Sequence, residues 1–141
     1  MKFWDSSAVV PLLVAEARSA SMSRLLESDP VQLVWWATEV ECASALARLE
    51  HDGQLDDSGA REAFDRLNVL SNSWHEIQAT EAVRRIARRL LRTHRLRAAD
   101  ALQLAGALVG SDDAPSSLEI VTLDERLVGA AEREGLRIST T

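Results

Sequence analysis

The sequence predicts an α/β fold: a mainly parallel sheet of about five short strands with helices on both faces. Short apolar segments of strand length alternate with helix-length segments along the chain. Parallel strands need long crossover connections, and helices are the usual crossovers. No internal repeat, low-complexity tract or linker interrupts the alternation, so residues 1–141 are expected to form a single domain.

Five short segments rich in apolar and β-branched residues are the strand candidates. They are residues 2–4, 32–36, 73–77, 119–122 and 136–138. Apolar runs this short are consistent with strands that are buried on both faces of a sheet. The segment 73–77 has the weakest pattern of the five.

Six segments between these candidates have helical patterns. They are residues 8–28, 38–52, 57–70, 79–96, 98–109 and 124–134. The clearest is 79–96, in which apolar residues recur at three- and four-residue intervals from Ala79 to Leu91. A loop at 110–117, rich in Gly, Ser, Asp and Pro, ends the fifth helix.

The composition is that of a soluble globular protein, with 46% hydrophobic and 27% charged residues among 141. The longest apolar run, residues 8–15, is too short to span a membrane and contains Pro11. The acid at position 5 interrupts the N-terminus too early for a signal peptide. A single cysteine, Cys42, excludes an intramolecular disulfide and a multi-cysteine zinc site. We therefore expect a cytoplasmic protein with no membrane association.

The charge distribution is uneven. The net charge is −6, but seven arginines and no acid occur between residues 84 and 97. The rest of the chain carries nine basic and 22 acidic residues, a balance of −13. Such a basic strip is a solvated helix face, a track for an RNA backbone or part of a partner interface.

Four acids occupy positions where an α/β sheet usually binds its ligands, at or near the carboxyl ends of strands. Asp5 follows the first strand, Glu41 the second and Asp124 the fourth, whereas Asp100 begins the helix 98–109. Hard cations such as Mg²⁺ and Mn²⁺ prefer oxygen ligands and can assist displacement at a phosphodiester. If the four carboxylates converge, their mutual repulsion should raise at least one pKa.

Each acid also has a purely structural explanation. Asp5 can cap a helix, and Thr38 with Glu41 and Thr122 with Glu125 fit the Thr-x-x-Glu capping box. Acids in a first helical turn are favoured by the helix dipole in any case. Spacing alone therefore does not decide between a metal site and ordinary helix capping.

Four motifs resemble those of PIN-domain ribonucleases, in order and along nearly the whole chain. The segment 96–105, LRAADALQLA, is similar to the third and most specific motif of the VapC-type toxins of type II toxin–antitoxin systems. The others are 3–8 (FWDSSA), 41–46 (ECASAL) and 120–127 (IVTLDERL). One departure is Gln103, where many relatives carry histidine. The resemblance implies a PIN-like three-layer α/β/α domain over residues 1–141.

The resemblance also implies an endoribonuclease that uses Mg²⁺ or Mn²⁺. Asp5, Asp100 and Asp124 would bind the metal with Glu41, directly or through water, and the metal would activate a water against the RNA. Neighbouring hydroxyl residues that could orient a carboxylate or water are Ser6, Ser7 and Thr122. Arginines that could contact RNA are Arg97, which has the best position, together with Arg85, Arg89 and Arg92.

The family further implies homodimers and a VapB-like antitoxin lying across helices near the N-terminus. The apolar residues available for such a groove are Val9, Val10, Leu12, Leu13, Leu25 and Leu26, which are equally suited to an ordinary core. A PIN nuclease of RNA processing without an antitoxin, or a catalytically silent binding module, remain alternatives. Retention of all four acids disfavours the silent module.

Other enzyme classes fit less well. A haloacid-dehalogenase-like phosphatase needs a second Asp two residues after the first, where this chain has Ser7. That class and receiver domains both use a lysine late in the chain, but Lys2 is the only lysine. The histidines at 51, 75 and 94 show no metal or catalytic spacing and are expected at or near the surface.

Overall fold

Five strands form one sheet in the computed structural model of the protein, which describes residues 1–139. They are β1 (Lys2–Trp4), β2 (Gln32–Trp35), β3 (His75–Ile77), β4 (Glu119–Val121) and β5 (Arg137–Ile138). Their spatial order is β3-β2-β1-β4-β5, and every neighbouring pair is parallel. Phe3 in the central strand aligns with Leu33 on one side and Ile120 on the other. The predicted parallel sheet is confirmed.

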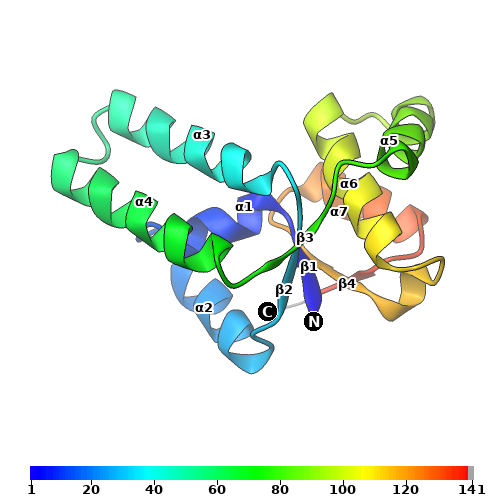
Figure 1. Cartoon of the computed structure of the whole chain (residues 1–141), viewed down its shortest axis with the longest axis horizontal. Helices are drawn as coiled ribbons and strands as arrows, with labels where there is room; N and C mark the ends of the chain where they lie inside the picture. Colours follow the sequence, from blue (N-terminus) through cyan, green and yellow to red (C-terminus); the bar gives the residue numbers. More distant parts are fainter. Residues whose placement is uncertain (140–141) are drawn as a thin grey trace.

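Helices cover both faces of this sheet (Figure 1). One face carries α1 (Ser6–Val9) with the 3-10 turn η1 (Val10–Leu12), α2 (Ser19–Ser28), α3 (Thr38–His51) and α4 (Asp57–Ser71). The other carries α5 (Glu81–Thr93), α6 (Ala98–Gly110) and α7 (Glu125–Arg133), and the 3-10 turn η2 (Pro115–Ser117) precedes β4. The three-layer arrangement predicted from the sequence is therefore confirmed.

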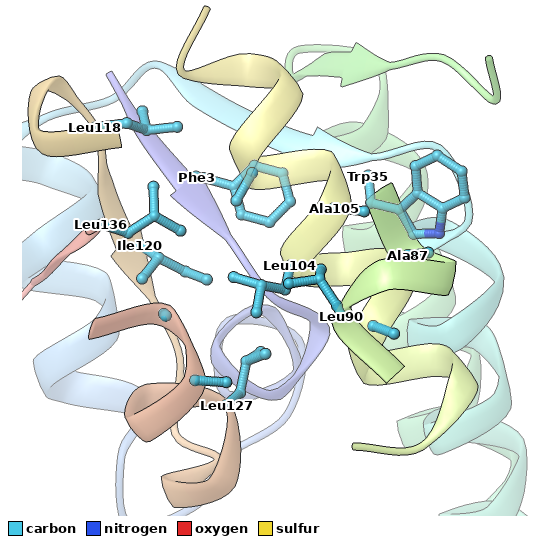
Figure 2. Packing of buried hydrophobic residues seen from close by; sticks show 14 of the residues in the cluster. Phe3, Trp35, Ala87, Leu90, Leu104, Ala105, Leu118, Ile120, Leu127 and Leu136 are labelled. Carbon is cyan, nitrogen blue, oxygen red and sulfur yellow. The ribbon is translucent and has the colours of Figure 1, made fainter. Parts of the chain in front are cut away.

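Two apolar cores lie on opposite faces of the sheet because successive strand residues point in opposite directions. In β1, Phe3 packs with α5, α6 and α7, whereas Trp4 packs with the helices α1 to α4. Figure 2 shows the first core, in which Phe3 of β1 lies near Leu104 of α6. Leu127 of α7 belongs to the same cluster. The side chains of Phe3 and Trp4 are both fully buried, which explains why the strand appears in the sequence as a continuous apolar segment.

The predicted helix 8–28 is wrong as a single element. The chain forms α1 and η1, leaves helical structure after Leu13, and begins again at Ser19. Pro11 lies in η1 and has no amide hydrogen to continue a helix. The Ser19 hydroxyl accepts from the Glu16 amide at 2.9 Å and donates to the Val14 carbonyl at 2.8 Å, which closes the intervening loop.

Most other boundaries differ from the predictions by one or two residues, but α5 is shorter at both ends. Thr80 caps its N-terminus by accepting from the Val83 amide at 3.4 Å, and His94 adopts an extended conformation after its last turn. His94 is buried, contrary to the expected surface position, and its Nε2 lies 2.7 Å from Glu134 Oε2. His51 and His75 are exposed, as expected.

None of the helices in residues 1–139 is long and apolar enough to cross a membrane.

Candidate active site

The order in which the chain adds strands to the sheet reverses beside the central strand, β1. The chain passes from β1 to β2 and β3 on one side, then crosses to β4 and β5 on the other. Clefts of parallel sheets form at the carboxyl ends of the strands that flank such a switch point, here β1 and β4. Asp5 follows β1 and Asp124 follows Thr122 and Leu123 after β4, so the fold places both acids at this point.

Asp5 is the most buried acid of the site, with 4% of its surface exposed. It caps α1, and its Oδ2 accepts hydrogen bonds from the Ser7 amide at 3.3 Å, the Ser7 hydroxyl and the Thr122 hydroxyl at 2.9 Å. These donors fix the orientation of the carboxylate. The structure thus places two of the three hydroxyl residues named from the sequence on Asp5, while Ser6 lines the adjacent groove.

Hydroxyl groups also connect the loop after β4 to β1. Thr122 Oγ1 accepts from the Asp124 amide at 3.1 Å, and Ser7 Oγ accepts from the Leu123 amide at 2.9 Å. The predicted capping box of Thr122 with Glu125 is wrong, because the cap of α7 is Asp124, whose Oδ1 accepts from the Arg126 amide at 2.9 Å. Thr122 instead joins two of the four acids.

Glu41 accepts a hydrogen bond from Gln103, a residue that the sequence analysis did not predict to be part of the site. Gln103 is 1% exposed, and its Nε2 donates to Glu41 Oε2 at 2.6 Å and to Thr38 Oγ1 at 3.1 Å. Gln103 lies three residues after Asp100, one helical turn along α6, and this spacing was the available signal. The predicted capping box of Thr38 with Glu41 is wrong, since α3 is capped at Ala37 and Thr38 is buried.

Burial and like charge act together on two of the acids, Glu41 and Asp5. The pKa of Glu41 is raised to about 7, mainly by burial and to a smaller extent by the charges of Asp5 and Asp100, against the opposing hydrogen bond from Gln103. The pKa of Asp5 is also raised, chiefly by burial and least by Asp100. Repulsion therefore contributes as expected, but desolvation is the larger cause.

Asp124 is separate from this trio. Its Oδ1 lies 3.8 Å from Arg126 Nε, and it is not among the charges that shift the pKa of Asp5 or Glu41. The network through Thr122 connects it to Asp5 indirectly. The structure therefore brings Asp5, Glu41 and Asp100 into electrostatic contact and places Asp124 at the edge of the site.

The chemistry of the donor set fits a hard divalent cation, because carboxylate and hydroxyl oxygens are the ligands such ions prefer. Two raised carboxyl pKa values indicate that an added positive charge would stabilise the ionised site. As the side chains are placed in residues 1–139, no three His, Cys, Asp or Glu groups stand close enough to hold an ion. A cation that keeps several of its waters could be held by one or two of these carboxylates directly and by the others through water.

A groove of about 500 Å³ runs beside Glu41 between α1 and α3. Ser6, Ser7 and Glu41 line it together with Arg48, which lies two helical turns beyond Glu41. The sequence analysis did not single out Arg48, although its seven-residue spacing from Glu41 places both on one helix face. Cys42 next to Glu41 is buried, and burial raises the pKa of its thiol to about 12.

The arginine strip follows the outer face of α5 and the turn into α6. Arg85, Arg89 and Arg92 are exposed on α5, and Arg97 is the residue that caps α6, three residues before Asp100. Arg89 forms an ion pair with Glu134, in which Nη2 lies 2.7 Å from Oε1.

The chain is similar to known proteins over nearly its whole length. Residues 2–133 match the family model of the PIN domain. Two curated relatives from Mycobacterium tuberculosis, ribonuclease VapC45 of strain CDC 1551 / Oshkosh and ribonuclease VapC49 of strain ATCC 25618 / H37Rv, are each 30% identical over 137 residues. The match covers 97% of this chain and 93% of each relative.

Two solved structures share the fold. PAE2754 from Pyrobaculum aerophilum superposes with a TM-score of 0.64 at 20% identity, covering 96% of this chain and 87% of that chain. FitAcB from Neisseria gonorrhoeae gives a TM-score of 0.69 at 18% identity, covering 99% and 97%. At these identities the likeness establishes the α/β/α architecture.

Proposed function

The chain belongs to the PIN-domain family, and from this premise we propose that it is an endoribonuclease dependent on Mg²⁺ or Mn²⁺. The observation that carries the proposal is the buried carboxylate of Asp5, fixed at the switch point of the sheet and electrostatically coupled to Glu41 and Asp100. Burying acids together costs stability, so such a cluster is typical of a functional site. The similarity to two VapC ribonucleases supports RNA as the substrate.

The residues of the site have separable tasks in this proposal. Asp5, Glu41 and Asp100 would hold the cation, with Asp124 joining through movement of its loop. The bound cation would supply positive charge beside the phosphate oxygens and would lower the pKa of a water. Ser7 and Thr122 keep Asp5 in one orientation, and Gln103 does the same for Glu41 through Oε2. Glu41 Oε1, which Gln103 does not bind, is the atom able to accept a proton from the attacking water.

We expect the purified chain to cut single-stranded RNA with Mg²⁺ or Mn²⁺ and to stop when EDTA is added. Water attack at phosphorus would break the P–O3′ bond and leave 5′-phosphate and 3′-hydroxyl ends. The described histidines form no pair that could activate a ribose 2′-hydroxyl, because His94 is buried against Glu134 while His51 and His75 are exposed. End analysis of the products by labelling checks this prediction.

The contrary outcomes have separate meanings. Cleavage that continues in EDTA would reject the metal requirement. Products with 2′,3′-cyclic phosphate would reject water as the nucleophile even if the protein is a ribonuclease.

We also propose that the protein is the toxin of a type II pair and that its antitoxin binds a groove between α2 and α4. Leu12, Leu13 and Leu26, three of the apolar residues named from the sequence, line a groove of about 440 Å³ together with Val69. Val69 is 73% exposed, so the apolar lining of the groove continues to the open surface of α4. Val9 is not available for this contact because it is fully buried in the core, and Leu13, which is 1% exposed, only forms the floor of the groove.

The antitoxin groove can be tested by co-expression with the product of any short open reading frame that is found adjacent to the gene. We expect the two products to co-purify from wild type and to separate when Val69 and Leu26 are both replaced by glutamate, because the charges oppose burial of the partner's apolar face. Val31→Glu, at an exposed apolar position outside the groove, is the control and should still co-purify. Retention of the partner by the double variant would place the interface elsewhere.

A further inference from the structure

Two arginine-lined grooves meet at Thr93. The first, of about 910 Å³, runs along α5 and is lined by Arg85, Arg88, Arg89 and Arg92. The second, of about 360 Å³, lies between the α5–α6 turn and α7 and is lined by Arg95, Arg126 and Arg133. Thr93 lines both, so the basic surface continues from one groove into the other. Figure 1 shows α5, α6 and α7 gathered on the same side of the sheet.

Most of these arginines have no acidic partner. Within residues 1–139, Arg84 pairs with Glu81 and Arg89 with Glu134, but the side chains of the following exposed arginines make no hydrogen bond or ion pair. They are Arg85, Arg88, Arg92, Arg95, Arg97 and Arg133. Uncompensated guanidinium groups repel one another, so their concentration on an otherwise acidic protein is favourable mainly when an anion lies between them.

The basic surface leads to the candidate active site. In the second groove, Arg126 is the neighbour of Asp124, with Nε 3.8 Å from Oδ1. At the turn, Arg97 caps the helix whose first turn carries Asp100. From Arg85 to Arg92 the path along α5 extends roughly 10 Å at 1.5 Å per residue. A chain of phosphates lying on both grooves would therefore arrive at the edge of the acidic trio.

We propose that the two grooves form a track for the phosphodiester backbone of single-stranded RNA, which holds the substrate on one side of the site. This inference rests on the proposed ribonuclease function. Guanidinium groups bind phosphates through paired donors. An acidic protein segment is the less suitable occupant, because the only large apolar side chain of the first groove is Leu91, and a protein interface needs an apolar centre.

The sequence analysis proposed only part of this track. The run 84–97 identified the α5 strip, but Arg126 and Arg133 lie 29 and 36 residues beyond the end of that run and join it only through packing of α7. Arg89 is a poor member to mutate, since Glu134 holds it and Glu134 also binds His94.

The test is the salt dependence of binding to a fluorescent 20-nucleotide oligouridine, measured by anisotropy in EDTA so that the RNA stays intact. The double variants are Arg88→Gln with Arg92→Gln for the first groove, and Arg95→Gln with Arg133→Gln for the second. Each phosphate contact adds about 0.7 to the slope of log K against log salt. Each pair should therefore lower the slope by ~1.4, and all four together by ~2.8.

The matched control is Arg24→Gln with Arg61→Gln, two exposed arginines on α2 and α4 that line neither groove. It makes the same change in net charge and should leave the slope unchanged. An unchanged slope in the groove variants, or an equal fall in the control, overturns the proposal. Loss of binding to polyglutamate but not to RNA would assign the surface to an acidic protein and would also overturn it.

Cleavage of total cellular RNA by the wild type with Mn²⁺ is measured in parallel, so that the result does not depend on whether oligouridine contains a cut site. If the groove variants lower the salt slope of RNA binding but the wild type does not cleave RNA, the ribonuclease function is rejected and the proposed RNA track is supported. Cleavage with an unchanged slope in both groove variants would keep the function and reject the track.

Discussion

Asn in place of Asp5 is expected to lower the rate of RNA cleavage by about 100-fold or more, since even outer residues that orient a metal ligand usually contribute 10–100-fold. Asparagine keeps the shape of Asp5 and can still cap α1, so the fold should survive. What the variant loses is one negative charge at the most buried point of the site. Initial rates on a fluorescent RNA with saturating Mn²⁺ measure the effect.

Glu39→Gln is the matched control for this experiment. Glu39 lies in the same acidic region of α3, two residues from Glu41, but its side chain is exposed and lines no groove beside Asp5. Its rate should stay within about twofold of wild type, in line with an exposed charge that is screened by water and salt. A similar loss in both variants would indicate a general effect of charge and not a site at Asp5.

Thr122→Val should have an intermediate effect on the same rate, about 10-fold to 100-fold, because it removes a donor to Asp5 without removing a carboxylate. The variant also removes the acceptor of the Asp124 amide, so the loop after β4 keeps only its second hydroxyl connection, from the Leu123 amide to Ser7 Oγ. A rate equal to wild type would show that the Ser7 donors alone orient Asp5.

The layers of the fold could be predicted from the sequence because the apolar pattern records burial. Phe3 and Trp4 are adjacent, and their burial on opposite faces is the physical origin of the unbroken apolar strand. The break between Leu13 and Ser19 was missed because the apolar pattern continues through it. What ends the helix there is Pro11 and two side-chain hydrogen bonds of Ser19, which periodicity does not record.

The candidate site divides in the same way. The acids after β1 and β4 could be placed at one edge of the sheet because parallel strands end together. The hydrogen bond from Gln103 to Glu41 could not be predicted. Gln103 reaches Glu41 from α6 across the end of the sheet, and this contact depends on how α3 and α6 are placed in the fold. Thr122 was predicted near the site, but its bond to Asp5 depends on β1 and β4 being neighbours.

The second large effect that we expect is the change in the free energy of unfolding, in the absence of metal, caused by ionisation of Glu41. Its folded pKa is about 7 against an ordinary 4.5, so the folded protein binds this proton more tightly than the unfolded chain does. Below pH 4.5 the group is protonated in both states and costs nothing. As the pH rises through the interval to 7 the free energy of unfolding falls, and above 7 the whole penalty is present.

Glu41→Gln should therefore be more stable than wild type at pH 8 in EDTA by about 1–2 kcal/mol, after allowance for the part of the carboxyl that water screens. Glutamine can still accept the bond from Gln103, so the packing is retained. At pH 5 the difference should fall to about a quarter of this value, because the carboxyl is then protonated in the folded state but still mostly ionised in the unfolded chain. Urea unfolding of wild type, Glu41→Gln and the exposed control Glu39→Gln at both pH values measures this.

Mg²⁺ should reverse the ranking at pH 8. A ligand that binds only the folded state stabilises it by mass action, and wild type retains the full set of carboxylates that would bind it. The melting temperature of wild type should rise more with Mg²⁺ than that of Glu41→Gln, with Glu39→Gln following wild type. If Glu41→Gln is less stable than wild type at pH 8 in EDTA, and Mg²⁺ shifts all three proteins equally, then Glu41 is a structural residue of α3 and does not bind the metal.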